Sequence, residues 1–377
     1  MKESARKIFP AFFMLSGTVI GASFLALPYI AAKTGLALML GYLLVLTFIV
    51  VIIHLFYADV VAATADFMRL PSYARIYLGR IGKSVALVST VIAFLGSLLA
   101  YVIIGESFLS SLLAPFFDGS HLLYAFAFFV LGAIIVFLGK KAVSEVDFLD
   151  IILFISALAV ILIFGGSSWK NANLFGGGAG ITRLRTSLDF FLPYGVLLSA
   201  LWGATVIPEM EEILGRYKGS LRKIVSWGVI IPAIFYLFFI LATIGVAGRG
   251  ISPESINGLK NYLPLAASSF LLIFGIIVVF TSYISLGLAL RNTLRFDFGI
   301  KKRPAWMISC FTPFLFYLVG FRNFIDVIGF VGGVALAIQG ILIILMYNKI
   351  KQRWILTLPL ILILLAGIVY EIIYFLK

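Results

Sequence analysis

The sequence predicts an all-α protein that crosses a lipid bilayer many times. Of its 377 residues, 62% are hydrophobic and only 12% are charged, and the mean hydropathy is +1.14. Soluble domains contain about 25% charged and about 45–50% apolar residues. Apolar runs that reach the length needed to span a bilayer, about 20 residues, recur along the whole chain. We therefore expect one transmembrane domain over residues 1–377, with the lipid bilayer as its surroundings.

Eleven apolar segments are expected to form the transmembrane helices. With the N-terminus inside, 21 of the 29 Lys and Arg residues fall in cytoplasmic segments and 8 fall outside. This bias follows the positive-inside rule and predicts a cytoplasmic N-terminus and an external C-terminus. It also accounts for the net charge of +13 without a nucleic-acid partner. The approximate segments are 8–30, 36–61, 84–108, 121–138, 147–166, 188–213, 224–247, 264–290, 304–320, 323–347 and 354–376.

The first segment contains an unusual stretch near its middle, Gly17-Thr18-Val19-Ile20-Gly21-Ala22-Ser23. Each glycine costs about 1 kcal/mol relative to alanine inside a helix, and Ser and Thr side chains compete for backbone hydrogen bonds. A break at membrane depth leaves backbone groups unpaired, which is tolerated where they line a cavity or bind a ligand. Free N–H groups suit a carboxylate, and free carbonyls suit an ammonium group or a metal ion.

Helix packing is the alternative explanation for these small residues. The spacing Gly17-x-x-x-Gly21 is typical of sites where two membrane helices approach closely. For an isolated membrane helix, packing is the commoner explanation. The sixth segment favours the break instead, because it has a similar interruption.

That sixth segment contains Leu201-Trp202-Gly203-Ala204-Thr205-Val206-Ile207-Pro208-Glu209. Both unusual segments open a block of five, residues 8–166 and 188–347, and an odd number of spans places two such blocks in opposite orientations. We therefore predict two inverted five-helix repeats with helices one and six broken, followed by an additional helix at 354–376. Trp202 is expected to close over a bound side chain, with core packing as the alternative.

Three motifs resemble those of a known transporter family. Residues 17–28, GTVIGASFLALP, resemble the first-helix signature of the amino acid/auxin permease family and the related tryptophan/tyrosine permeases. Val206-Ile207-Pro208-Glu209 resembles their sixth helix, and Thr281-Ser282-Tyr283-Ile284-Ser285-Leu286-Gly287-Leu288 resembles their eighth. The resemblance to these members of the amino acid–polyamine–organocation superfamily covers essentially the whole chain. It implies the leucine-transporter-type fold, alternating access and a prokaryotic plasma membrane.

The resemblance also implies that an amino acid binds between helices one and six. Carried over by position, the N–H groups of Gly21, Ala22 and Ser23 would hold the substrate carboxylate. Carbonyls near Ile20, and those from Leu201 to Ala204, would hold its ammonium group. The expected substrate-binding residues are Ile20, Gly21, Ala22, Ser23, Leu201, Trp202, Gly203, Ala204 and Thr205.

In sodium-coupled relatives an ion lies between helices one and eight. The matching groups here are the carbonyls of Gly17, Ile20 and Val278 and the hydroxyls of Thr281 and Ser282, an all-oxygen set that suits an alkali cation. The alternative is that both hydroxyls bond back to carbonyls one turn earlier. Because tryptophan/tyrosine permeases are generally regarded as proton-coupled, Na⁺ and H⁺ both stay open as the coupling ion. No cofactor and no further metal are expected.

Ionisable side chains at membrane depth cost about 2.5 kcal/mol or more, so each is a functional candidate. Glu106, near the outer end of the third segment, and Glu209, at the end of the sixth, are candidate gate or proton-carrying residues. His54 and Tyr57 share one helix face and are expected to form a hydrogen-bonded pair. Glu371, near the outer end of the last segment, is assigned no special role.

The sequence contains no Walker loop, His-x-x-x-His pair or nucleophile elbow, so no enzyme activity is expected. We expect a secondary transporter that moves a neutral amino acid, aromatic ones among the candidates, together with Na⁺ or H⁺. The alternatives are an amino acid exchanger and a membrane nutrient sensor on the same fold. The sequence determines neither the particular amino acid nor the oligomeric state.

Overall fold

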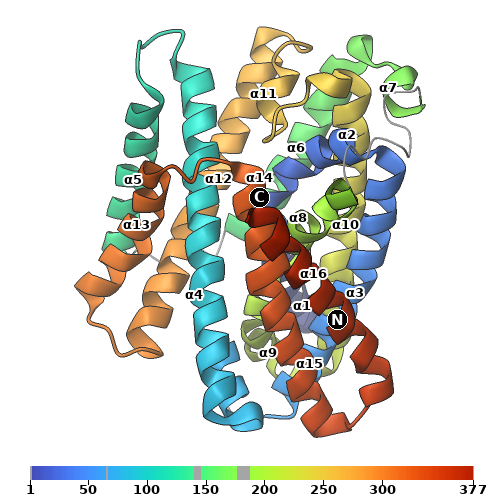
Figure 1. Ribbon diagram of the computed structural model, residues 1–377, viewed down its shortest axis with the longest axis vertical. Helices are drawn as coiled ribbons and strands as arrows, with labels where there is room; N and C mark the ends of the chain where they lie inside the picture. Colours follow the sequence, from blue (N-terminus) through green and yellow to red (C-terminus); the bar gives the residue numbers. More distant parts are fainter. Residues whose placement is uncertain (1, 65–66, 140–145, 176–186, 377) are drawn as a thin grey trace.

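The computed structural model describes residues 2–64, 67–139, 146–175 and 187–376, and this part of the chain is a bundle of helices without a β-strand (Figure 1). The α-helices are α1 (Lys2–Val19), α2 (Leu27–Thr34), α3 (Leu36–Ala62), α4 (Leu70–Leu113), α5 (His121–Leu138), α6 (Val146–Gly165), α7 (Asn171–Phe175), α8 (Leu192–Leu201), α9 (Ile207–Leu214), α10 (Leu221–Ala247), α11 (Ile256–Leu259), α12 (Leu265–Phe296), α13 (Lys302–Val319), α14 (Phe324–Phe330), α15 (Ala337–Lys351) and α16 (Trp354–Phe375). Short 3₁₀ helices are η1 (Ala22–Ala26), η2 (Gly166–Ser168), η3 (Ser187–Phe191), η4 (Ala204–Val206), η5 (Gly215–Ser220) and η6 (Gly248–Gly250), and η7 (Val331–Leu336) is a π-helix.

The expected helices agree closely with the observed ones. Segments 36–61, 121–138 and 354–376 match α3, α5 and α16 to within one residue at each end. Segment 84–108 is part of the longer α4, in which Gly79 has φ 76° and ψ −160° and separates a short first helix from the spanning part. A positive φ at this position favours glycine because it has no Cβ.

A test based on helix length and composition alone gives fewer membrane spans than the eleven expected. In the described part of the chain, eight helices are long and apolar enough to cross a membrane, or up to nine if the bent pair over 6–34 is one span. This test takes residues 189–250 as one run, although the run contains α8, α9 and α10. It also leaves out α13. The expected count of eleven is therefore not confirmed.

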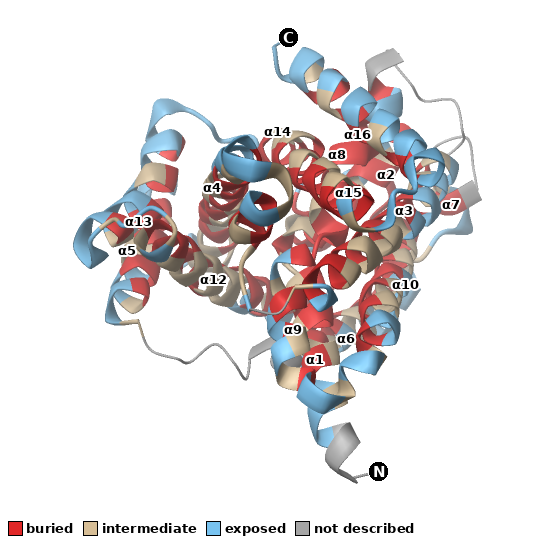
Figure 2. Cartoon of the chain, turned by 90° about the horizontal axis from the view of Figure 1, so that it is seen from below, coloured by how far each residue is buried: buried red, intermediate tan, exposed pale blue. Residues whose placement is uncertain are grey.

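The helices enclose a core and present apolar side chains outward. α4 packs against α12, α5, α15 and α13, and α10 packs against α3 and α1. Viewed from below, the buried residues face the interior of the bundle and the exposed ones lie on its periphery (Figure 2). Large apolar side chains are exposed on α5 and α16, among them Leu131, Ile355 and Leu362. Such surfaces suit a protein whose solvent is lipid.

α8 lies deep in this bundle. All of its residues except Ser199 are buried, which agrees with a helix that is apolar on every face. It packs against η7, α14, α3, η1 and α2, so it contacts both the first and the last thirds of the chain. This central position places the break at its end in the middle of the molecule.

Candidate functional site

Helix one is broken where the sequence predicts. α1 ends at Val19, Gly21 is extended with φ −84° and ψ −179°, and the chain continues in η1 at an angle of 42°. Gly21 N–H donates to the carbonyl of Val19 at 2.7 Å instead of continuing the α-helical pattern. The N–H groups of Ala22 and Ser23 open η1, so no acceptor inside that helix is available to them.

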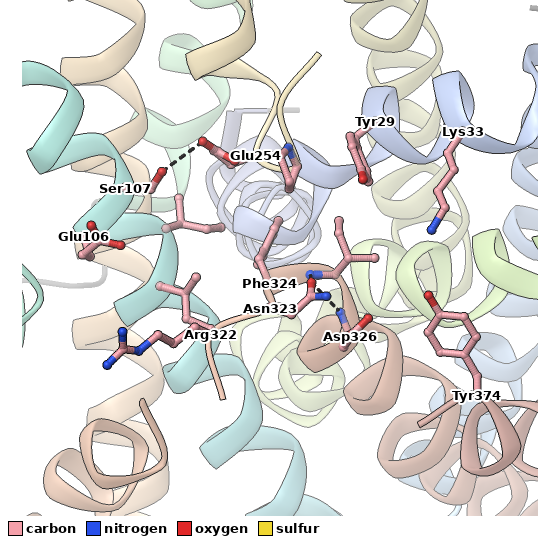
Figure 3. A pocket seen from close by; sticks show the side chains of 14 residues that line it. Tyr29, Lys33, Glu106, Ser107, Glu254, Arg322, Asn323, Phe324, Asp326 and Tyr374 are labelled. Carbon is pink, nitrogen blue, oxygen red and sulfur yellow. Dashed lines mark hydrogen bonds between the residues drawn. The ribbon is translucent and has the colours of Figure 1, made fainter. Parts of the chain in front are cut away.

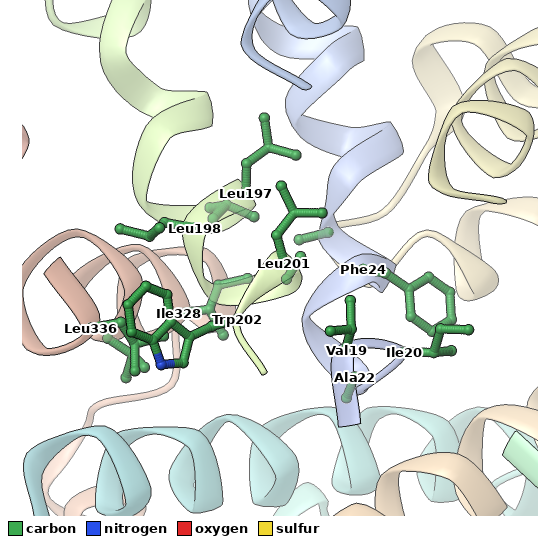
Figure 4. Close-up of a cluster of buried hydrophobic side chains, with 14 of the residues drawn as sticks. Val19, Ile20, Ala22, Phe24, Leu197, Leu198, Leu201, Trp202, Ile328 and Leu336 are labelled. Atoms are coloured by element: carbon green, nitrogen blue, oxygen red, sulfur yellow. The ribbon is translucent and has the colours of Figure 1, made fainter. Parts of the chain in front are cut away.

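Helix six is broken at the corresponding place. α8 ends at Leu201, Trp202 is extended with φ −80° and ψ 121°, and Gly203 has φ −136° and ψ 14°. The chain then resumes as η4 and α9. The prediction of two broken helices is therefore confirmed. Figure 4 shows the two breaks beside each other, with the indole of Trp202 turned away from Val19 and Ala22 and toward Ile328 and Leu336.

Tyr236 of α10 links the two breaks. Its fully buried hydroxyl lies 2.6 Å from the carbonyl oxygen of Val19 and 3.1 Å from that of Ala200. One phenol proton is thus shared between the last turn of α1 and the last turn of α8. Local sequence patterns did not identify Tyr236, because its partners lie 217 and 36 residues away.

His54 of α3 holds the break in helix six. Gly203 N–H donates to His54 Nε2 at 2.9 Å, and the other ring nitrogen, Nδ1, lies 2.8 Å from the carbonyl of Val50. Because Nε2 accepts, Nδ1 carries the proton and donates to that carbonyl. The imidazole also packs edge-on against Trp202 with 5.2 Å between ring centroids. The expected His54–Tyr57 hydrogen bond is wrong, since both nitrogens of the ring have other partners.

A cavity of about 490 Å³ lies between the two breaks and α4, α12 and α15. Of the expected substrate and ion residues, it is lined by Gly17, Gly21, Ser23, Trp202, Ala204, Thr205 and Ser282. Ile20, Ala22, Leu201, Gly203, Val278 and Thr281 are not among its lining residues. The cavity is therefore lined by the middle of both breaks and by α12. Several of the expected residues do not line it.

Polar groups that sequence reasoning did not select also belong to this cavity. The hydroxyls of Ser23 and Ser199 are hydrogen-bonded at 3.0 Å and join η1 to α8. Gln339 of α15 lines the cavity, and within the described residues neither atom of its buried amide has a partner. The indole N–H of Trp202 is also without a hydrogen-bond partner among the described residues. The signal for Ser199 and Gln339 was a single polar residue within an apolar run, which does not distinguish a site from packing.

Trp202 lies in the wall of the cavity. Its side chain is only 6% exposed and is flanked by Ile328 and Leu336 (Figure 4). A Cβ at Gly340 would lie 3.4 Å from its ring. The indole is therefore packed against α15 and His54 in this conformation, and a role as a lid stays a prediction.

At the expected ion site, the Thr281 hydroxyl bonds back to carbonyls of its own helix, which is the alternative to ion binding. Thr281 Oγ1 donates within its own helix, to the carbonyls of Ile277 at 2.9 Å and Val278 at 3.0 Å. Ser285 Oγ in turn donates to the Thr281 carbonyl at 3.0 Å. The Thr281 hydroxyl is thus bonded back to its own helix, while Ser282 faces the cavity.

Charged residues surround one end of the central cavity. Arg69, Glu209 and Asp297 line it there, and Arg69 and Asp297 form an ion pair at 3.6 Å. Glu209 is exposed toward this space. Nearby, Arg222 at the start of α10 pairs with Asp59 at the end of α3. All of these basic residues belong to the set that the charge distribution assigns to the cytoplasm.

A second pocket, of about 390 Å³, lies at the opposite end of α4 (Figure 3). Glu106 lines it and forms an ion pair with His121. Lys33, Arg322, Glu254 and Asp326 supply further charges to its wall, and Ser107 Oγ donates to Glu254 at 3.0 Å.

The two cavities contact different parts of α4. The central cavity touches α4 as far as Tyr101, and the second pocket begins at Ile103. They share no lining residue in the described part of the chain, and Val102 between them is fully buried. A packed layer therefore lies between the central cavity and the pocket that contains Glu106.

Comparison with known proteins agrees with this architecture. The chain is 25% identical over 341 residues to tyrosine-specific transport system 1 of Haemophilus influenzae, which covers 85% of this chain and 82% of the relative. It is 23% identical over 339 residues to glutamine transporter 2 of Aliivibrio fischeri, with coverage of 86% and 84%.

Solved structures share the fold. The structure of MhsT in complex with L-phenylalanine superposes with a TM-score of 0.69 at 16% identity and covers 95% of this chain and 98% of MhsT. A nucleobase-cation-symport-1 family transporter in a closed conformation with bromovinylhydantoin bound gives 0.65 at 14% identity, with coverage of 89% and 77%. These similarities confirm the expected leucine-transporter-type fold.

The sequence profile of the tryptophan/tyrosine permease family matches residues 4–358. Of the two branches that the motifs resemble, this is the one that the comparisons support, and the amino acid/auxin permeases are a different branch. The chain belongs to the tryptophan/tyrosine permease family.

Proposed function

We propose that this protein carries a neutral amino acid across the plasma membrane by alternating access, in symport with a cation. The observation that carries the proposal is the pair of helix breaks that line one cavity. Unpaired backbone groups at membrane depth are costly unless a ligand or water satisfies them. A zwitterion supplies both an acceptor and a donor.

The carboxylate is assigned to the start of η1. Ala22 and Ser23 present N–H groups there, and the positive end of a helix attracts an anion. Gly21 lines the cavity, and a Cβ at this position would lie 3.5 Å from the Thr18 carbonyl, so a larger side chain would extend into the space.

The ammonium group is assigned to carbonyls of the two breaks. Tyr236 occupies the carbonyls of Val19 and Ala200. Of the carbonyls expected to hold the ammonium group, those of Trp202 and Ala204 belong to residues that line the cavity, and we assign the ammonium group to them.

The side chain of the substrate is assigned to the wall formed by α4, α8 and α15. Phe94 and Trp202 supply apolar surface, and Ser199 and Gln339 supply hydrogen-bonding groups. The volume of about 490 Å³ falls within the range of small-molecule sites, about 300–1,000 Å³. The named substrates of the two relatives, tyrosine and glutamine, are both neutral with a polar side chain, and we propose them first as candidate substrates.

The packed layer beside Val102 supports alternating access. With a cytoplasmic N-terminus, the central cavity would open inward through the end that carries Arg69 and Asp297, and the pocket with Glu106 would face outward. Opening the layer while closing the Arg69–Asp297 end would move the bound amino acid from one side to the other. Glu106 and Glu209 are then assigned to the outer and inner entrances.

Uptake into proteoliposomes tests the proposal. Purified protein should accumulate labelled tyrosine or glutamine under a pH or Na⁺ gradient, and Gly21→Leu should abolish this uptake. Gly41→Leu is the matched control, because a Cβ at Gly41 meets nothing within 4 Å. Replacing Na⁺ by choline, with and without a pH gradient, identifies the coupling ion. Exchange without accumulation would indicate an exchanger, and binding without either would indicate a sensor.

A further inference from the structure

Glu371 is a buried carboxyl group that the sequence left without a role. It lies on α16, a helix with many outward-facing apolar residues, yet Glu371 is only 4% exposed. Three glycines leave the room that it occupies. A Cβ at Gly195 would lie 2.2 Å from Glu371 Oε1, one at Gly333 would lie 2.1 Å from its Cγ, and one at Gly329 would lie 3.4 Å from Oε2.

Among the described residues, this carboxyl has no cationic partner in an ion pair. Gly195 of α8 packs directly against its Oε1. The carboxyl group of Asp326 on α14 is a second acidic group that interacts electrostatically with Glu371. The other titratable groups around it are Tyr194 of α8, Tyr370 and Tyr374 of α16, Asp189 of η3 and Tyr42 of α3. Lys33 lines the same pocket as Asp326 and Tyr374.

A carboxylate in such a place is costly. Burial of an unpaired ion costs several kcal/mol, and at membrane depth an ionisable residue marks an ion or proton pathway by default. Binding of one proton converts the carboxylate into a neutral acid and removes this cost without any metal or second side chain. The chemistry of the site therefore suits a proton, and glycines lie close to both carboxyl oxygens.

The outer pocket provides access to this site. Asp326 and Tyr374 both line the 390 Å³ pocket (Figure 3), and both interact electrostatically with Glu371 or its neighbours. A proton that enters from the side of Glu106 therefore meets groups next to Glu371 without crossing the central cavity.

The same carboxyl contacts the element that positions the helix-six break. Gly195 lies within α8 and Trp202 directly follows that helix, and the carbonyl of Gly195 is packed so closely against η7 that a Cβ at Gly332 would lie 1.8 Å from it. η7 is a π-helix, a feature found frequently at functional sites. We therefore expect a change in the charge of Glu371 to alter the packing of α8 against η7. A shift of α8 would also move Ser199 and the break at the end of this helix.

We propose that Glu371 is the binding site of the co-transported proton, and that its protonation couples the outer pocket to the position of α8. The proposal rests on the transport function proposed above. Protonation from the outer side forms one O–H bond at the carboxyl, and release to the inner side breaks it, so one proton moves in each cycle and no other bond changes.

Glu371→Gln tests the proposal, because glutamine is close in size to the neutral acid and cannot release a proton. In proteoliposomes with labelled tyrosine, we expect the variant to lose accumulation driven by a pH gradient, at least tenfold, and to retain exchange of internal for external tyrosine. Asp118→Asn, which removes an exposed carboxylate after α4, is the control and should accumulate tyrosine like the wild type. Wild-type accumulation in Glu371→Gln would overturn the proposal.

A second measurement does not depend on the variant. A pH-sensitive dye inside wild-type vesicles should report acidification when tyrosine enters, and entry without acidification would overturn the proton site. Accumulation under a Na⁺ gradient but not under a pH gradient would overturn it as well, while leaving the transport function intact. Absence of both uptake and exchange in the wild type would instead contradict the transport function.

Discussion

Removal of the acceptor nitrogen of His54 tests whether this side chain holds the substrate site. His54→Leu introduces an apolar side chain of moderate size and leaves Gly203 N–H without its acceptor at 2.9 Å. A buried donor without a partner costs about 1–3 kcal/mol. Loss of the edge-on contact with Trp202 adds about 0.5–1.5 kcal/mol.

These magnitudes determine the expected effect on binding. If about 2 kcal/mol of this total destabilises the conformation of Trp202 and Gly203 that binds the substrate, the affinity for the amino acid falls about 30-fold. This follows because 1.4 kcal/mol corresponds to a factor of ten. His54→Gln keeps an oxygen that can accept from Gly203 N–H. We expect this variant to recover most of the affinity.

The assay is equilibrium binding of labelled tyrosine to purified protein, with the thermal unfolding midpoint measured on the same samples. The reasoning predicts weaker binding for His54→Leu than for His54→Gln at equal folded protein. Equal affinities for the wild type and His54→Leu would refute it, because the Gly203 hydrogen bond would then have no influence on the site. A lower unfolding midpoint with unchanged affinity would show that His54 stabilises the fold only.

Three further predictions follow from individual contacts. Tyr236→Phe removes the hydroxyl between Val19 and Ala200; a net loss of about 1 kcal/mol should weaken tyrosine binding about fivefold, and unchanged binding would contradict the assigned link. Gly332→Ala should lower the free energy of unfolding by about 1–3 kcal/mol, because its Cβ would lie 1.8 Å from the Gly195 carbonyl; Gly41→Ala, in open space, is the control for denaturant unfolding. Thr281→Ala combined with Ser282→Ala should leave uptake driven by a pH gradient within about twofold of the wild type, since Thr281 bonds to its own helix, and should abolish any stimulation by Na⁺; a loss of pH-driven uptake in this variant would show that the two hydroxyls take part in proton coupling.

Local chemistry predicted the elements of the fold well. Apolar length predicted α3, α5 and α16 almost to the residue, because the thickness of the bilayer sets the length of a spanning helix. The breaks at Gly21 and Gly203 were also predicted from the sequence. Glycine and hydroxyl residues weaken a helix where they stand together, so neighbours in the chain indicated where the interruptions lie. Distant contacts from His54 and Tyr236 then hold them.

Polar residues inside the spans were predicted less well. His54 was expected to pair with Tyr57, three residues away, and instead contacts Gly203, 149 residues away. Glu371 was expected near the outer end of the last span with no special role, and the sequence did not indicate that glycines of α8, α14 and η7 enclose it. In both cases the residue type was visible in the sequence, and the face of the helix to which it would be turned was not.

The sequence by itself determined that this protein is a membrane bundle with two interrupted helices, because length, apolarity and helix propensity act along the chain. Only the tertiary structure decided which groups meet at the interruptions. Tyr236, His54, Ser199 and Glu371 come from four different helices, and their partners depend on how each helix is rotated about its axis. That rotation is set by the packing of side chains between helices, which has no counterpart in the spacing of residues within one of them.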